Sequence, residues 1–159
     1  RVLGLAQKVG VSVYGPSDLD VVWSDQLDLA QAPFNVFDRS LASSRWLERF
    51  AADGVEVHTR SAFLQGLLLM KERPRYFDRW SDLFVRWDEW LAETSLDPVA
   101  ACIGASLSEP SIGRAVVGVE SVAQLQDILV AVEQPIPSPP DTLRIDDPDL
   151  IDPSQWSLA

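Results

Sequence analysis

Residues 54–68 read GVEVHTRSAFLQGLL, and this stretch decides the fold. Its first part, VEVHT at 55–59, is short, rich in β-branched residues and bounded by a glycine, which predicts a strand. Gly54 is the residue type that most often ends a helix, so we expect a helix immediately before the strand. The stretch therefore predicts a strand that follows a helix and leads into an ordered loop.

Strands and helices alternate on both sides of this stretch. The expected strands share short apolar runs and cover residues 9–14, 27–34, 55–59 and 115–119. The expected helices share helical spacing of apolar residues or a capping sequence and cover residues 16–25, 40–52, 76–94, 97–107 and 121–132. This alternation indicates the α/β class, with a parallel sheet and crossover helices. The alternation alone fits either half of an eight-stranded barrel or a small doubly wound sheet.

Composition and charge narrow the range of functions. The 159 residues suffice for one domain, whereas a complete (β/α)8 barrel needs roughly 200 or more. A net charge of −11 argues against nucleic acid as a partner, and no apolar run is long enough to span a membrane. Cys102 is the only cysteine, so an internal disulfide is excluded and a reducing, cytoplasmic location is expected. The start at Arg1 rather than Met leads us to expect a missing upstream part.

Several conspicuous residues are expected to be structural. His58 lies within a predicted strand and has no partner at metal-ligand spacing, so no metal site is expected. Cys102 and the tryptophans 80, 87 and 90 lie at helical spacing among apolar residues and predict packing faces. Residues 1–133 are expected to form the folded unit. Residues 134–159 are expected to form a proline-rich, acidic tail that extends over its surface.

Four strand ends resemble those of the aldo/keto reductase family. The segments VGVSVY at 9–14 and LDLAQAPFN at 27–35 are similar to the family's fifth and sixth strands. The opening stretch at 54–68 resembles the seventh strand and its loop, and VVGVESVAQL at 116–125 resembles the eighth strand and its phosphate-binding turn. The motifs follow one another in family order over most of the chain. The resemblance implies half of a (β/α)8 TIM barrel, with strands five to eight, the C-terminal half.

The resemblance implies a binding site for NADPH or NADH. Ser12 and Gln31 match the residues that hydrogen-bond the nicotinamide carboxamide in the family. Arg60 stands where the family carries an aromatic residue that stacks on the nicotinamide, and Tyr14 is a possible substitute. Further matching positions are those that contact the pyrophosphate and the adenosine: Ser61, Phe63, Gln65, Gly118, Glu120, Ser121, Gln124 and Asp127. Gly118 is expected to let the chain turn after the strand, and Ser121 to cap the next helix.

Residues in and near the turn at 118–125 predict which of the two cofactors is preferred. Gln124 stands where NADPH-preferring members often carry arginine, and Ile128 replaces a frequent asparagine. Glu120 would repel a 2′-phosphate and could accept a hydrogen bond from a free 2′-hydroxyl. We expect use of NADH, or of both cofactors, rather than strict preference for NADPH.

The family's catalytic tyrosine, lysine, aspartate and histidine belong to its first half. The only tyrosines here, Tyr14 and Tyr76, do not match the catalytic one, so no catalytic residue is assigned. The resemblance thus implies the cofactor-binding half of a carbonyl reductase, inactive alone, which acts on a small carbonyl substrate only with the N-terminal half of the barrel. Two alternatives are a non-catalytic half-barrel interaction protein and another phosphate-binding barrel enzyme.

Overall fold

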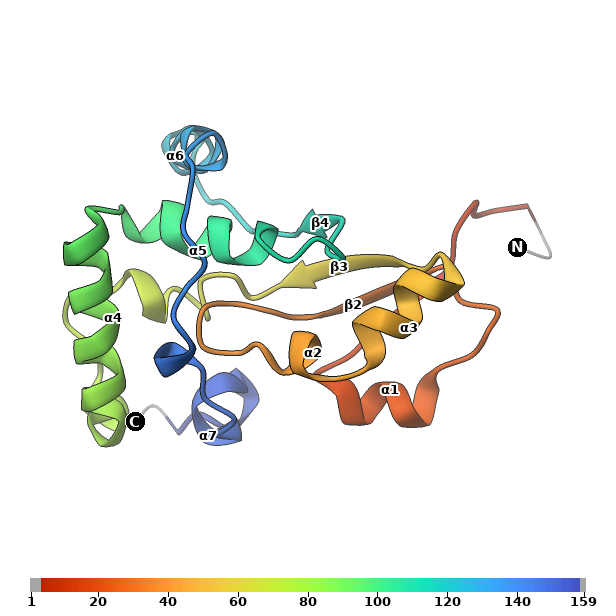
Figure 1. Ribbon diagram of the computed structural model, residues 1–159, viewed down its shortest axis with the longest axis horizontal. Coiled ribbons are helices and arrows are strands. Elements are labelled where there is room, and N and C mark those ends of the chain that lie inside the picture. Colours follow the sequence, from red (N-terminus) through yellow and green to blue (C-terminus); the bar gives the residue numbers. More distant parts are fainter. Residues whose placement is uncertain (1–3, 158–159) are drawn as a thin grey trace.

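The computed structural model describes residues 4–157 and contains one parallel sheet (Figure 1). Its strands are β1 (Gly10–Ser12), β2 (Leu29–Pro33), β3 (Glu56–Arg60) and β4 (Arg114–Ala115), and they are adjacent in this order. All three neighbouring pairs are parallel. The predicted α/β class, the strand order and the parallel pairing are therefore confirmed.

One face of the sheet is buried against two helices. Apolar side chains of β2 and β3, among them Ala30 and Val57, are almost fully buried. They share a cluster with Leu19 of α1 (Pro16–Val22) and Phe50 of α3 (Trp46–Asp53). Alternate residues of a strand point to opposite faces, so the side chains of Gln31 and His58 lie on the other face of the sheet.

A second apolar cluster lies beyond the carboxyl ends of the strands. It joins η1 (Leu67–Leu69), η2 (Arg75–Trp80), α4 (Ser81–Thr94) and α5 (Pro98–Leu107). The predicted tryptophan packing face is confirmed, since Trp87 is fully buried and Trp80 and Trp90 are nearly so. Cys102 is buried in the same cluster, as expected.

The tail is a structural part of this second cluster. It contains η3 (Asp141–Leu143), α7 (Pro148–Ile151) and η4 (Pro153–Gln155), so the expectation of an extended segment is wrong in part. Leu143 and Leu150 are fully buried. Arg39 holds the entry to the tail, because its guanidinium donates to the carbonyls of Pro139 and Pro140 at 3.1 and 2.8 Å. Anchored in this way, the tail covers the cluster.

Several predicted elements differ from the structure in extent; the helix expected at 76–94, for example, begins as the 3-10 helix η2. Residues 40–52 form α2 (Ser40–Ser43) and α3 instead of one helix. The Ser44 hydroxyl donates to the Leu41 carbonyl and accepts from the Trp46 amide, an alternative to helical hydrogen bonding that separates the two. The strand expected at 115–119 is β4, only two residues long. It ends early because its neighbour β3 turns away at Ser61, whose φ is 62°.

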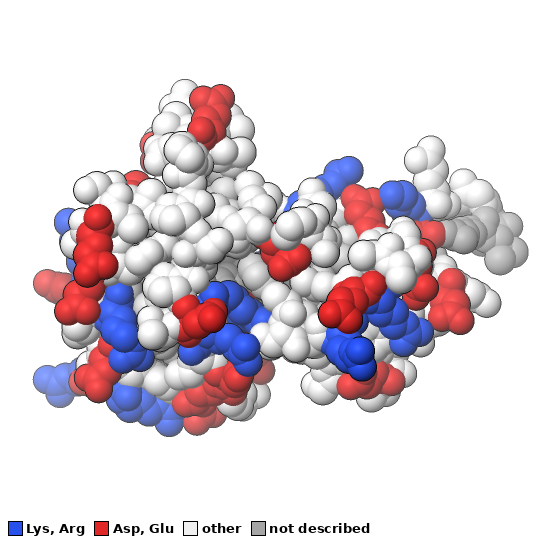
Figure 2. Space-filling view, in the orientation of Figure 1, with Lys and Arg blue, Asp and Glu red and all other residues white. Residues whose placement is uncertain are grey.

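Helix α6 (Val122–Val132) has the predicted apolar stripe but little to pack against. Figure 1 shows it beyond α5, at the margin of the fold. Of the five stripe residues only Ile128 is buried, while Val122 and Leu129 are 72% and 59% exposed. The helix carries few charges in the view of Figure 2. Apart from Ile128, the stripe therefore faces away from the part of the chain that the structure describes.

Candidate functional site

Two polar side chains meet on neighbouring strands at the face of the sheet opposite α1 and α3, which we call the inner face. The Ser12 hydroxyl of β1 donates to the side-chain carbonyl of Gln31 on β2 at 2.9 Å, and the two residues are paired in register. Within residues 4–157 this leaves the Gln31 amide N–H groups and the Ser12 oxygen available. Together they offer one donor and one acceptor, the complement of a carboxamide.

The loop after β3 has an unusual backbone. Ser61, Leu64 and Gln65 have positive φ angles of 62°, 47° and 54°, and Gly66 follows at 83°. Non-glycine residues rarely adopt this conformation, and such strain persists only where the surroundings fix it. Here Leu64 is fully buried, and the Asn35 amide donates to the Ser61 carbonyl at 3.2 Å. The core therefore holds a strained loop in one shape.

A groove of about 610 Å³ lies between this loop and the start of α6. Eight of the twelve residues expected to bind cofactor line it: Arg60, Ser61, Phe63, Gln65, Gly118, Glu120, Gln124 and Asp127. They come from β3, the strained loop, the turn after β4 and the first turns of α6. The groove thus brings together two segments about 50 residues apart in the sequence.

The N-terminus of α6 closes one end of the groove. The Ser121 hydroxyl accepts from the Gln124 amide at 3.2 Å, so the predicted cap is confirmed. The Gln124 side chain in turn accepts from the Glu120 amide at 2.7 Å. The remaining N–H groups of the first turn, with the helix dipole, favour an anion there. The Gln124 amide N–H groups remain as donors for a ligand.

The charges of the groove are separated. Glu120 and Asp127 lie at the α6 side, and Arg60 is the only cation among the residues that line the groove. The Arg60 guanidinium is fixed at the strand end, where it donates to the Val13 carbonyl at 3.0 Å and to the Ser61 hydroxyl at 3.2 Å. It also lies 5.0 Å from the centre of the Tyr14 ring. The α6 side is therefore acidic and the strand side is basic.

The other four expected residues lie outside the groove lining. Ser12 and Gln31 form the inner-face pair, Ser121 caps α6, and Tyr14 stacks with Arg60 at a neighbouring pocket. The role expected of Gly118 is wrong, because the turn after β4 does not need a glycine there. Gly118 is not among the positive-φ glycines, and a Cβ atom built on it would meet nothing within 4 Å. What the glycine leaves is open space beside the groove.

Sequence reasoning missed the apolar wall of the groove. Leu69, Val99, Val116, Val117, Val119 and Ile128 also line it. Val99 belongs to α5 and Leu69 to η1, and no local pattern connects these elements. The available signal was on α6, where Gln124, Asp127 and Ile128 are spaced three and four residues apart and so share one face.

Two residues expected to be structural remain so. The His58 ring lies 2.7 Å from the Glu56 carboxylate, which also pairs with Arg114 at 3.1 Å. Burial raises the pKa of the Cys102 thiol, so the thiol is unreactive. Within residues 4–157 no group of histidine, cysteine and carboxylate side chains could hold a metal ion, and no helix is long and apolar enough to cross a membrane.

Comparison with known proteins identifies the fold. No protein-family model matches the sequence, and no curated protein is similar to it. Among solved structures, the aldo-keto reductase AKR11C1 from Bacillus halodurans superposes with a TM-score of 0.68 in its apo form and 0.66 in its holo form, at 18% and 17% identity. Each match covers 86% of this chain, and 49% and 48% of the reductase.

A second reductase gives the same result. The thermostable aldo-keto reductase Tm1743, solved with the inhibitor epalrestat, matches with a TM-score of 0.61 and 17% identity over 89% of this chain and 48% of its own. The chain thus spans about half the length of the structures it matches. Its four parallel strands and their helices have the fold of half an aldo-keto reductase TIM barrel.

Proposed function

We propose that this chain is the C-terminal, cofactor-binding half of an NAD(P)H-dependent aldo-keto reductase. The observation that carries the proposal is the groove between the strained loop and α6, where eight residues expected from the sequence converge. The fold likeness to aldo-keto reductases supports it, and so does the order of the four strand motifs along the chain. When bound, the nicotinamide would supply the hydride that reduces a carbonyl.

The residues present suit a dinucleotide. The Ser12–Gln31 pair offers the donor and acceptor that a carboxamide needs, and the first turn of α6 offers N–H groups to a phosphate. The apolar wall around Val117 and Ile128 suits the face of a planar ring. In this arrangement Gln31 and Ser12 orient the nicotinamide, and the groove holds the rest of the molecule.

We assign the chain a preference for NADH, or equal use of both cofactors. A 2′-phosphate is usually met by arginine or lysine. Glu120 and Asp127 line the α6 side of the groove, and the one lining cation, Arg60, is fixed to the Val13 carbonyl at the strand side. Glu120 could instead accept a hydrogen bond from a free 2′-hydroxyl.

The proton donor of the reaction belongs to the other half of the barrel. The Tyr76 hydroxyl donates to the carbonyls of Asp149 and Gln155, at 3.3 and 3.4 Å, and so fastens the tail. Tyr14 lies on the Arg60 guanidinium and not at the Ser12–Gln31 pair. The exposed stripe of α6 supports the existence of a partner half, because it would be covered there.

The test is binding of NADH to the purified chain, measured by isothermal titration calorimetry. Gln31→Ala should weaken binding by roughly 1–3 kcal/mol, since the hydrogen bond from the Gln31 amide is lost and the carboxamide carbonyl is left unpaired. Gln26→Ala is the matched control, because Gln26 is exposed and lies outside the groove lining. Equal affinity of the chain and both variants, or no saturable binding, would refute the proposal.

A further inference from the structure

A second pocket, the tail pocket, lies beside the cofactor groove and shares Arg60 and Gln65 with it. Its volume is about 590 Å³. Its other walls come from η1, η2 and the tail, which contributes Pro153, Ser154 and Trp156. Because the tail forms one wall, the pocket exists only when the tail is folded against the second apolar cluster.

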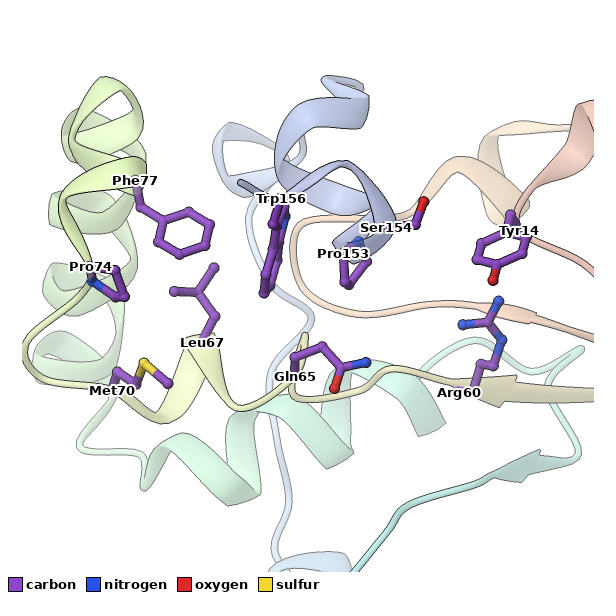
Figure 3. Close-up of a pocket in the computed structure, with 10 residues that line it drawn as sticks. All are labelled: Tyr14, Arg60, Gln65, Leu67, Met70, Pro74, Phe77, Pro153, Ser154 and Trp156. Carbon is purple, nitrogen blue, oxygen red and sulfur yellow. The ribbon is translucent and has the colours of Figure 1, made fainter. Parts of the chain in front are cut away.

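Figure 3 shows that the tail pocket has two chemically different ends. Tyr14 and Arg60 lie side by side at one end, with Gln65 and Ser154 next to them. Met70, Phe77 and Trp156 lie toward the other end. The pocket is therefore polar and cationic at one end and apolar and aromatic at the other.

The apolar end is preformed. The Phe77 and Trp156 rings meet edge to face with their centres 4.9 Å apart. The Trp156 indole N–H donates to the Leu150 carbonyl at 3.0 Å, so its orientation is fixed and no polar atom of the ring needs a ligand. Such rings present a flat, rigid surface to another ring at little entropic cost.

The cationic end has a charge that the described part of the chain leaves unpaired. No carboxylate oxygen in residues 4–157 forms an ion pair with Arg60 within 4.0 Å. Asp38 is close enough for the two charges to interact, but its Oδ1 atom accepts from the Ser40 amide and hydroxyl at 3.1 and 2.6 Å rather than from Arg60. Arg60 uses two N–H groups on Val13 and Ser61, and its other donors are available.

We propose that the tail pocket binds an aromatic or otherwise flat carboxylate, with its carboxylate on Arg60 and its apolar body against Trp156, Phe77 and Met70. A guanidinium matches a carboxylate in geometry and charge, and partial burial strengthens the pair. The aromatic end fixes the direction in which the ligand lies. The site shares Arg60 and Gln65 with the dinucleotide groove, but its apolar end at Met70, Phe77 and Trp156 lies outside that groove, so the test is made without dinucleotide.

The test compares 2-naphthoate with 2-naphthamide, which has the same rings but no charge. Calorimetry on the purified chain without dinucleotide should show naphthoate binding about tenfold more tightly, since hydrogen bonds to a charged group are the stronger ones. Arg60→Met should abolish this preference, and Arg60→Lys, which keeps a charge, should retain part of it. Arg45→Met is the control, because Arg45 is 96% exposed and lies on another face.

Changes at the other end separate the two contributions. Trp156→Leu should weaken both probes by a similar factor and leave their ratio unchanged. Circular dichroism of each variant shows whether the fold is kept, and Arg60→Lys carries the test if Arg60→Met unfolds. Absence of naphthoate binding at millimolar concentration, equal affinity for both probes, or an unchanged ratio in Arg60→Met and Arg60→Lys would each overturn the proposal.

Discussion

Helices α5 and α6 are neighbours in the fold, and both are mostly apolar, but their surroundings differ. Most residues of α5 are buried, and the tail residue Ile136 packs directly on its Gly104. On α6 only Ile128 and Ala131 are buried. The sequence of α5 is apolar or small throughout and predicts burial, and the amphipathic α6 predicts a buried stripe, so only the second expectation fails. The described residues therefore complete the environment of α5, whereas they leave most of the α6 stripe exposed.

The largest expected effect is a loss of stability on removal of a side chain from the second apolar cluster, which the tail covers. Trp87 is fully buried and its indole N–H donates to the Leu68 carbonyl at 3.2 Å. Trp87→Ala should lower the free energy of unfolding by about 3–5 kcal/mol, because it leaves a large cavity. Leu129→Ala on α6 should change it by less than about 0.5 kcal/mol, since the side chain is 59% exposed. Urea denaturation measures both, and similar losses would show that α6 is packed in solution.

The contact between the tail and α5 gives the next effect. A Cβ atom on Gly104 would lie 2.6 Å from the Ile136 Cβ atom, too close for the helix and the tail to keep their positions. Gly104→Ala should therefore destabilise the chain by about 1–3 kcal/mol, despite the better helix propensity of alanine. Adding Ile136→Gly, which removes the Cβ atom in the clash, should recover part of the loss in a double-mutant cycle. Additive losses in the double variant would mean that the tail does not rest on α5.

A change in the exposed stripe of α6 should alter self-association of the chain rather than its free energy of unfolding. Leu129→Lys places a charge in the middle of the exposed stripe. Sedimentation velocity should show less concentration-dependent association than in the unchanged chain, with unfolding free energy altered by less than about 0.5 kcal/mol. Val85→Lys is the matched control, since Val85 is 52% exposed on α4, outside the α6 stripe. If both lysines reduced association equally, the stripe of α6 would have no special role.

The smallest effect is electrostatic and concerns the inner face of the sheet. Hydrogen bonds from Lys8 and His58, with the charges of Lys8 and Arg114, lower the pKa of the Glu56 carboxyl from 4.5 to about 2. A carboxyl whose pKa is depressed by folding stabilises the fold above its unfolded pKa and loses that contribution as pH falls. The stability of the chain relative to Glu56→Gln should therefore decline between about pH 4.5 and 2. A parallel pH profile for the two proteins, measured by urea denaturation, would contradict this.

Local signals predicted most of the fold. The strand positions followed from short β-branched runs, and the cap at Ser121 followed from a side chain that accepts a hydrogen bond from a nearby amide. Two expected boundaries failed, one through a neighbouring strand distant in the sequence and one through local hydrogen bonds that compete with helical ones. The strand at 115–119 was too long because its length is set by where β3 turns away, and the helix at 40–52 was divided by hydrogen bonds of Ser44.

The candidate site divides in the same way. Gln31 and Arg60 could be proposed because they match positions in the strand motifs that resemble those of the aldo/keto reductases. Val99 and Leu69 could not, because tertiary packing alone brings α5 and η1 to the groove. The role expected of Gly118 in a tight turn was also wrong, since the backbone there has no positive φ.

We propose above that the groove between the strained loop and α6 holds a dinucleotide. The most direct measurement is an NMR titration of the ¹⁵N-labelled chain with NADH. If the groove binds NADH, the chemical shifts of the amides at 60–66 and 116–128, and of Ser12 and Gln31, should change saturably. The amide chemical shifts of α1 should stay unchanged. Shifts confined to the tail pocket around Trp156, or no saturable shift at all, would contradict it.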